Sequence, residues 1–115
     1  MEYKKIKLKF REVDRDIFEA VKSGRKTVET RAATERYKNI KVGDTLILIC
    51  GKNKLEKKIK RVKVFKTITA LLKKYKAKQI NPNVRSGEEL EKMYYTFPDY
   101  KEKIRKSGLI AMELK

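Results

Sequence analysis

Apolar and polar residues follow a strand-like pattern near both ends of the sequence. Over residues 3–10, apolar side chains alternate with lysines, which is the period of a half-buried β-strand. Residues 45–50 and 109–114 are continuous apolar runs, which are typical of strands buried on both faces. Cys50, at the end of the first run, is expected to pack in the core as a small hydrophobic side chain. These segments predict three strands of one sheet.

A fourth, longer strand is predicted over about 55–66, after a turn rich in glycine, asparagine and lysine. Its alternation is interrupted, because Leu55 and Ile59 share one parity and the valines that follow have the other. A β-bulge near Lys60 or Arg61 would restore the register. We therefore expect a hairpin whose second strand carries a bulge and presents several lysines on its outer face.

Helical spacing of apolar residues replaces the alternation in two parts of the chain. A short helix is predicted over about 14–22, with Asp14 at its N-cap and Gly24 at its C-cap. Between Thr67 and Gly108 the pattern predicts two further helices and a short third one.

The order of predicted elements is β-α-β-β-β-α-α-(α)-β, with residues 26–31 as the second strand. A hairpin inside this order requires antiparallel pairing, so a purely parallel sheet is excluded. We expect an α+β fold, a small mixed β-barrel of about five to six strands flanked by three to four short helices. A chain of 115 residues has the usual size of one domain, so residues 1–115 are expected to form a single domain.

Positive charge dominates the sequence and is concentrated in one region. The chain has 32 Lys and Arg against 15 Asp and Glu, a net charge of +17. Residues 51–78 contain twelve Lys or Arg and one acidic residue, Glu56, so this region alone contributes +11. A Lys- and Glu-rich surface is also typical of heat-adapted proteins, but ion-pair networks would need a more even balance. The imbalance favours a polyanionic partner, and nucleic acid is the first to consider.

The residue inventory excludes several classes of site. There is no histidine and Cys50 is the only cysteine, which excludes disulfides, zinc fingers and Ser-His or Cys-His catalysis. We accordingly expect neither a metal nor another cofactor. No apolar run approaches the roughly 18 residues of a membrane span, and the start lacks the apolar stretch of a signal peptide. A cytoplasmic protein without membrane contact, monomeric by default, is expected.

One stretch, GRKTVETR at residues 24–31, has an unusual density of charge for a strand. Strict alternation would place Glu29 and Arg31 on one face and Lys26 on the other. If Gly24 ends the preceding helix, however, Lys26 can lie in the turn and swing towards Glu29. Such a group would bind an anion or the edge of a base, because the planar Arg guanidinium donates several hydrogen bonds and the Glu carboxylate accepts them. The alternative is a surface ion pair worth about 0–1 kcal/mol.

The spacing Gly24-x-Lys26-x-x-Glu29-x-Arg31, with Val-Gly-Asp at 42–44 before a strand, resembles the hallmark of the ASC-1 homology (ASCH) domain. The similarity extends along nearly the whole chain. It implies a PUA-like fold, a β-barrel with helices at its rim, in a superfamily associated with RNA binding and modified nucleobases. It also implies that Lys26, Glu29 and Arg31 line a ligand cleft beside the barrel. The partner expected from this resemblance is RNA or a modified nucleoside.

The same resemblance offers an alternative, a small hydrolase acting on modified nucleosides or on RNA. Some relatives hydrolyse N4-acetylcytidine with a Lys, a Thr and a Glu. This sequence matches the Lys at Lys26, but Glu29 stands in the place of the Thr and Asn83 in that of the Glu. An enzyme would then need a rearranged site, with Glu29 as base and Lys26 as electrostatic stabiliser, and a shifted pKa at one of them.

Further candidate ligand-binding residues lie elsewhere in the sequence. Tyr37 and Tyr95 either stack on bases or pack against the protein, whereas Tyr94 has the helical spacing of a core residue. Basic residues of the bulged strand are expected to contact phosphates, which adds affinity but no sequence choice. These basic candidates are Lys57, Lys58, Lys60, Arg61 and Lys63.

Overall fold

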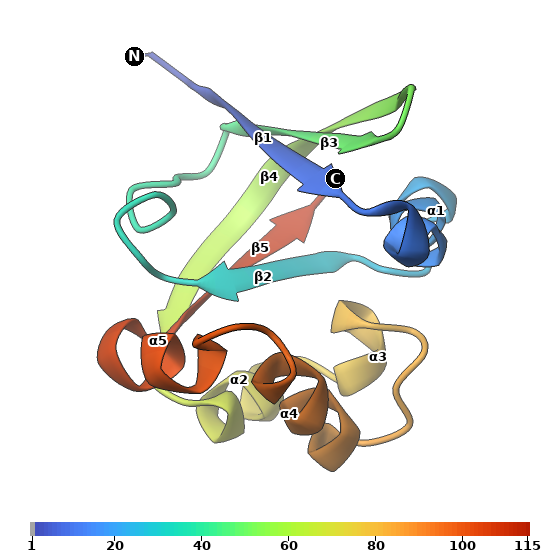
Figure 1. Cartoon of the computed structure of the whole chain (residues 1–115). Coiled ribbons are helices and arrows are strands. Elements are labelled where there is room, and N and C mark those ends of the chain that lie inside the picture. Colours follow the sequence, from blue (N-terminus) through green and yellow to red (C-terminus); the bar gives the residue numbers. More distant parts are fainter. Residues whose placement is uncertain (1) are drawn as a thin grey trace.

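The computed structural model describes residues 2–115, which form five strands and five α-helices (Figure 1). The strands are β1 (Lys5–Phe10), β2 (Val28–Ala32), β3 (Thr45–Cys50), β4 (Asn53–Phe65) and β5 (Leu109–Leu114). The helices are α1 (Arg15–Ser23), α2 (Ile68–Lys74), α3 (Ala77–Ile80), α4 (Gly87–Tyr95) and α5 (Tyr100–Ser107). A 3-10 turn at Glu12–Asp14 precedes α1. The predicted order of elements is confirmed except for one additional short helix, α3, between α2 and α4.

The strands form one mixed sheet in the order β1-β3-β4-β5-β2. β1 pairs with β3 in parallel, and the other three pairs are antiparallel. The sheet curls into a half-barrel, with α2 to α5 together on one side and α1 at one end (Figure 1). The predicted α+β class is confirmed, but the barrel is open, since β1 and β2 are the two unpaired edges of the sheet.

The predicted bulge in β4 is the point at which the sheet bends. The register shifts between Ile59 and Arg61, so that Lys60 is the additional residue. Before the bulge β4 pairs with β3, and after it β4 pairs with β5. A bulge increases the local twist, and here it directs the two halves of one strand into the two walls of the half-barrel.

Two hydrophobic cores lie on opposite faces of the curled sheet. The first fills the half-barrel and includes Leu48, Cys50 and Met112, together with Phe18 of α1. The second lies between the sheet and the helices, where Tyr94 packs with residues of α2 to α5. Cys50 is fully buried and Tyr94 is 2% exposed, which confirms the core positions predicted for both.

Two local predictions differ from the structure. The second strand begins at Val28, two residues later than predicted, because the chain between α1 and β2 is still a turn at Lys26. Asp14 occupies the N-cap position of α1, but its carboxylate accepts a hydrogen bond from Arg11 Nε at 2.9 Å and caps no helical N–H. Thr67, in contrast, caps α2, since its hydroxyl accepts from the Ala70 N–H at 3.0 Å.

Asp44, which is fully buried, joins three segments of the half-barrel. Its carboxylate accepts the backbone N–H of Lys4 and that of Lys41, both at 3.0 Å. Replacing Asp44 with alanine is expected to lower the free energy of unfolding by about 2–3 kcal/mol, because two charge-assisted hydrogen bonds are lost. Urea denaturation would measure the change, with Asp44→Asn as a control that retains one acceptor oxygen and loses less.

Candidate functional site

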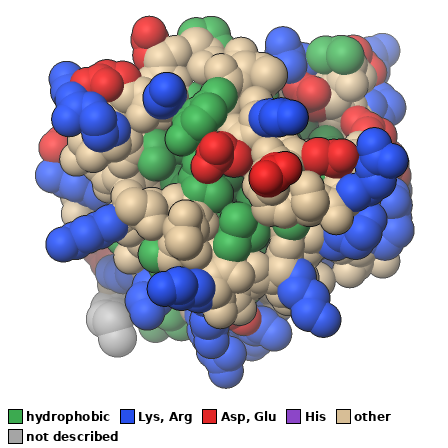
Figure 2. Space-filling model, turned by 90° about the horizontal axis from the view of Figure 1, so that it is seen from below, with side chains coloured by type: hydrophobic (Ala, Val, Ile, Leu, Met, Phe, Trp, Pro, Cys, Tyr) green, Lys and Arg blue, Asp and Glu red, His purple; other side chains and the backbone are tan. Residues whose placement is uncertain are grey.

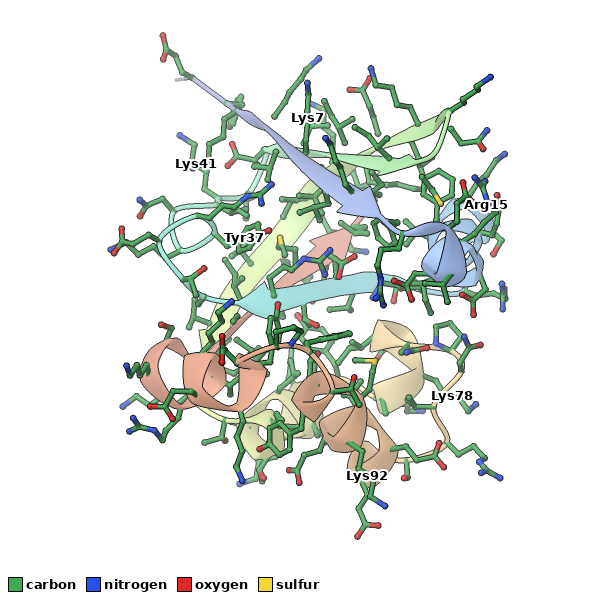
Figure 3. All side chains as sticks on the ribbon, viewed as in Figure 1. Lys7, Arg15, Tyr37, Lys41, Lys78 and Lys92 are labelled. Carbon is green, nitrogen blue, oxygen red and sulfur yellow. The ribbon has the colours of Figure 1, made fainter. Side chains whose placement is uncertain are left out.

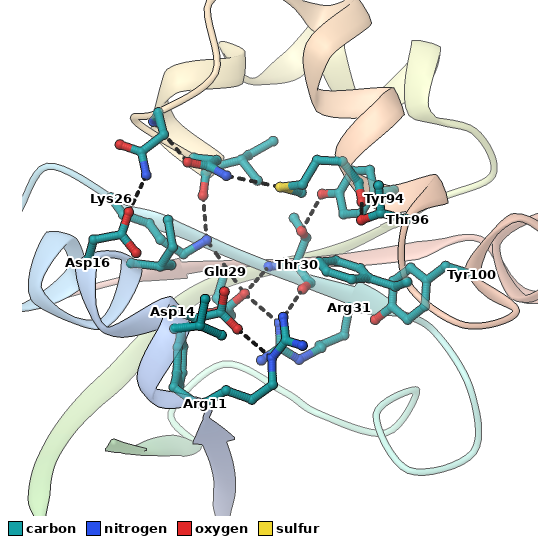
Figure 4. Close-up of a pocket in the computed structure, with 18 of the residues that line it drawn as sticks. Arg11, Asp14, Asp16, Lys26, Glu29, Thr30, Arg31, Tyr94, Thr96 and Tyr100 are labelled. Atoms are coloured by element: carbon teal, nitrogen blue, oxygen red, sulfur yellow. Dashed lines mark hydrogen bonds and ion pairs between the residues drawn. The ribbon is translucent and has the colours of Figure 1, made fainter. Parts of the chain in front are cut away.

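A cleft of about 900 Å³ opens between the half-barrel and the helical layer, beside β2 (Figure 4). The end of β1 and the first turn of α1 line one side, and the α3–α4 and α4–α5 regions line the other. Because β2 pairs only with β5, its second edge is free of strand partners and faces this cleft.

Side chains form hydrogen bonds with the backbone groups on the free edge of β2. The Thr30 N–H donates to Glu29 Oε1 at 3.0 Å, and the Thr30 carbonyl accepts from Arg31 Nη1 at 3.0 Å. The Ala32 N–H donates to the Tyr100 hydroxyl at 3.2 Å. Capped in this way, these backbone groups are not free to pair with another strand.

The motif residues converge in this cleft. Lys26 lies in the turn before β2, and its Nζ is 3.6 Å from Glu29 Oε1 while it also donates to the carbonyl of Ile80. Arg31 Nη1 lies 2.9 Å from the same Glu29 oxygen. The other carboxylate oxygen, Glu29 Oε2, is buried and has no hydrogen-bond partner among residues 2–115. The site therefore contains one unused acceptor, on a residue that is 2% exposed.

Burial and neighbouring charges shift the pKa values of these three groups. Burial would raise the pKa of the Glu29 carboxyl, but Arg31 and Lys26 outweigh it and hold that pKa below 4.5. Burial lowers the pKa of the Lys26 amine below 10.5, and the Glu29 charge does not fully compensate. Burial also acts to lower the pKa of Arg31, but Glu29 and two tyrosines raise it overall. The cluster thus combines an ionised carboxylate with an amine that gives up its proton more readily than usual.

Aromatic side chains form the wall of the cleft on the helical side. Tyr94 and Tyr100 stack with ring centroids 6.3 Å apart, and Phe97 meets Tyr100 edge-on at 5.3 Å. The Tyr94 hydroxyl is hydrogen-bonded to that of Thr30, which ties α4 to the edge strand. Across the cleft, Arg31 lies 6.0 Å from the centroid of the Phe10 ring. A flat ligand would therefore meet aromatic surface beside the charged cluster.

Several other candidates lie outside the cleft. Tyr95 is 42% exposed, lines a separate smaller groove, and lies under Lys101. Tyr37 packs against the core of the half-barrel, with Arg36 over its ring at 5.2 Å. None of the five basic candidates on β4 lines the cleft, and they do not share one face. Lys57 pairs with buried Leu46 on the inner face and is half-buried, whereas the other four are exposed. That these residues contact phosphates stays a prediction.

The sequence analysis did not identify every residue of the cleft. Asp16, on α1, accepts a hydrogen bond from Asn83 of the α3–α4 connection, and both line the cleft. Arg11 and Asp14 form an ion pair at its rim, with Nε and Oδ2 2.9 Å apart. Arg11 and Asp14 are three residues apart, a common spacing that does not indicate a cleft, whereas Asp16 and Asn83 are 67 residues apart and meet only because of the positions of whole elements.

The open half-barrel, the helices along its rim and the motif cluster beside β2 define an α+β domain of the PUA-like class. The sequence matches the ASCH domain family over residues 12–114, and the chain belongs to this family. It is similar to hypothetical protein PH0355, known from a crystal structure, with 30% identity, a TM-score of 0.79, and 99% of this chain and 98% of that one covered.

A second similar structure is the solution NMR structure of protein PF0455 from Pyrococcus furiosus. The identity is 30% and the TM-score 0.72, and the likeness covers 100% of this chain and 96% of that one. Among curated proteins, no significant match was found.

Two further observations limit the kinds of site present in residues 2–115. These residues include no group of three or more His, Cys, Asp or Glu side chains that could hold a metal ion. Within the same range, every helix is too short or too polar to span a lipid bilayer.

Proposed function

We propose that this ASCH domain is an RNA-binding module that receives one nucleotide in the cleft beside β2. The observation that carries the proposal is the buried, unpartnered Glu29 Oε2 within a charged and aromatic cleft. The PUA-like fold of the family is often linked to RNA binding, and a net charge of +17 favours a polyanion.

The chemistry of the cleft favours a nucleobase over a simple anion. A phosphate or sulfate would bring negative charge against Glu29 Oε2, whereas an exocyclic amine or ring N–H would donate to it. Arg31 keeps 24% of its side chain exposed and can donate to a carbonyl or phosphate of the same ligand. Tyr100 and Phe97 supply the aromatic surface on which bases stack in single-stranded RNA recognition.

Basic residues of β4 are proposed to contact phosphates beyond the cleft. Lys58, Lys60, Arg61 and Lys63 are exposed, and Lys57 is half-buried. Contacts of this kind add affinity and salt dependence without selecting a sequence. Base choice would then rest on the cleft alone.

Binding of single-stranded RNA and of ribonucleosides, measured for the wild type and for Glu29→Gln, tests the proposal. Glutamine has the same shape but can place an N–H where Oε2 accepts, so a loss of about 10- to 100-fold is expected. Glu88→Gln, at an exposed site on α4, removes the same charge and should bind like the wild type. Near-UV circular dichroism would establish that each variant is folded.

Arg31→Gln provides a second variant in case Glu29→Gln unfolds, since Arg31 is partly exposed. It should weaken nucleotide binding while the fold persists. Equal affinity of the wild type and both cleft variants, or RNA binding that does not depend on salt, would contradict the proposal.

A hydrolase remains the second candidate because of Lys26, a buried amine with a lowered pKa beside a carboxylate. The low pKa of Glu29 is opposite to what a general base near neutral pH requires, whereas burial moves the pKa of Lys26 towards neutral pH. Release of acetate from N4-acetylcytidine that disappears in Lys26→Met would support this candidate. Absence of turnover in a wild type that binds the nucleoside would exclude that substrate class.

A further inference from the structure

A second charged surface lies on the outer side of the sheet, away from the helices. The pairing of β1, β3 and β4 aligns their outward residues in three rows across the sheet. The rows are Lys5–Thr45–Lys58, Lys7–Ile47–Glu56 and Lys9–Ile49–Lys54. We call the lysines of this array the basic sheet face. Lys7 projects from β1 on the side opposite α2 to α5, and no helix lies over this part of the sheet (Figures 1 and 3).

The basic sheet face has almost no compensating charge. Its five lysines are exposed, and Glu56 is the one acidic side chain in the array, 3.7 Å from Lys5. Ile47 lies between them on the same face and is only 8% exposed. Lysine stems can cover apolar surface of this kind while their ammonium groups remain in water.

The opposite side of the molecule has a different character. The helical face shows acidic and apolar side chains near its centre, with Lys and Arg around them (Figure 2). The exposed acids Glu88, Glu91 and Glu102 belong to these helices. A polyanion would therefore find predominantly positive charge on the basic sheet face and a mixed surface on the helices.

The basic sheet face is continuous with the cleft. Lys9 belongs to both, and Phe10 and Arg11, which follow it in sequence, also line the cleft. Outward side chains along β1 are spaced about 6.6 Å apart and neighbouring strands about 4.8 Å. The lysines thus form a track that starts at the mouth of the cleft and extends along β1.

We propose that the basic sheet face binds the sugar-phosphate backbone of a single RNA strand whose neighbouring nucleotide occupies the cleft. The inference rests on the function proposed above and deepens it, because it gives the path of the strand: over β1, β3 and the first half of β4. A single strand is required, since a base must be splayed out of any helix to reach buried Glu29. Lysines on exposed edge strands also hinder pairing between sheets, but that role predicts no dependence on RNA length.

The test compares two triple variants with identical charge, K5Q/K7Q/K54Q on the basic sheet face and K73Q/K92Q/K106Q on helices α2, α4 and α5. All six lysines are exposed, and none of them lines the cleft. Binding of a ribonucleoside monophosphate and of single-stranded RNAs of increasing length is measured by fluorescence anisotropy or calorimetry at several salt concentrations. Vesicles containing phosphatidylserine serve as a second polyanionic probe.

For the wild type, affinity is expected to rise with RNA length. The face variant should lose this gain, with a loss of up to about 50-fold near physiological salt and a salt slope smaller by about 2, as for three lost phosphate contacts. Its affinity for the monophosphate should not change, and the helix variant should stay within about 3-fold of the wild type.

Equal losses in the two triple variants would overturn the inference, because the effect would then be one of net charge. A face variant that loses vesicle binding while keeping RNA binding would assign the surface to membranes and overturn it as well. If oligonucleotides bind through the face but no monophosphate binds, the face is upheld and the nucleotide cleft is refuted. The two proposals thus fail separately.

Discussion

Replacing Glu29 with alanine is expected to lower the free energy of unfolding by about 3–5 kcal/mol, the usual cost of breaking a buried ion pair from one side. Lys26 is 5% exposed, and its Nζ would keep only the carbonyl of Ile80 as a partner in the described part of the chain. The Thr30 N–H would also lose its acceptor. Urea denaturation at pH 7 would measure the loss.

A double-mutant cycle with Lys26→Met isolates the electrostatic part of this cost. Lys26→Met alone should cost less, because Glu29 keeps the Arg31 guanidinium and the Thr30 N–H as donors. The double variant should be more stable than Glu29→Ala alone, since no uncompensated amine remains buried. Strictly additive effects would show that Lys26 and Glu29 do not interact.

The pKa shifts of this pair also determine how stability responds to pH. The pKa of Glu29 is lower in the folded state than its ordinary 4.5, so its contribution is present above pH 4.5 and is lost as the pH falls through the folded value. The pKa of Lys26 is lowered as well, so burying its charge costs stability at neutral pH, and this cost disappears as the pH rises towards 10.5. Wild-type stability should therefore fall more steeply in acid than that of Glu29→Gln, measured by urea denaturation from pH 6 to 3.

The convergence of the motif could be predicted because it depends on local structure. Gly24 ends α1 in a left-handed conformation, with φ of 84°, and the residues before Val28 form a turn in which Lys26 is free of strand alternation. Glu29 and Arg31 then share a face by simple period two. The bulge at Lys60 was likewise visible in sequence, as a change of parity in the apolar residues of β4.

The remaining features of the site depend on contacts between distant elements. Ile80 and Tyr94 reach the motif across more than fifty residues of sequence, and neither carries a pattern that marks its partner. The sequence shows how many lysines β4 has but not which surface each one faces, because the two halves of the strand, on either side of the bulge, belong to different walls of the half-barrel. The lysines of β1, by contrast, alternated clearly in sequence, and only the pairing with β3 and β4 made them one surface.

Gly108 connects the helical layer to the sheet, and its replacement by alanine is expected to cost about 3–5 kcal/mol. Its backbone has φ of 76° and ψ of −167°, a region that is essentially restricted to glycine, which accounts for about 1–3 kcal/mol. A Cβ at this position would also lie 2.4 Å from the carbonyl oxygen of Phe65, so the backbone of β4 or β5 must move. Thermal or urea denaturation would measure the loss.

Gly24→Ala is the matched control for this prediction. Gly24 also has a positive φ, of 84°, but among residues 2–115 an added Cβ would meet no atom within 4 Å beyond its chain neighbours, so only the left-handed conformation is penalised, by about 1–2 kcal/mol. The difference between the two variants therefore measures the contact with Phe65. Because all five residues of β2 pair with β5, displacing the start of β5 should also disturb Glu29 and Arg31. Nucleotide affinity should then fall in Gly108→Ala, and equal stability of the two glycine variants would contradict this account.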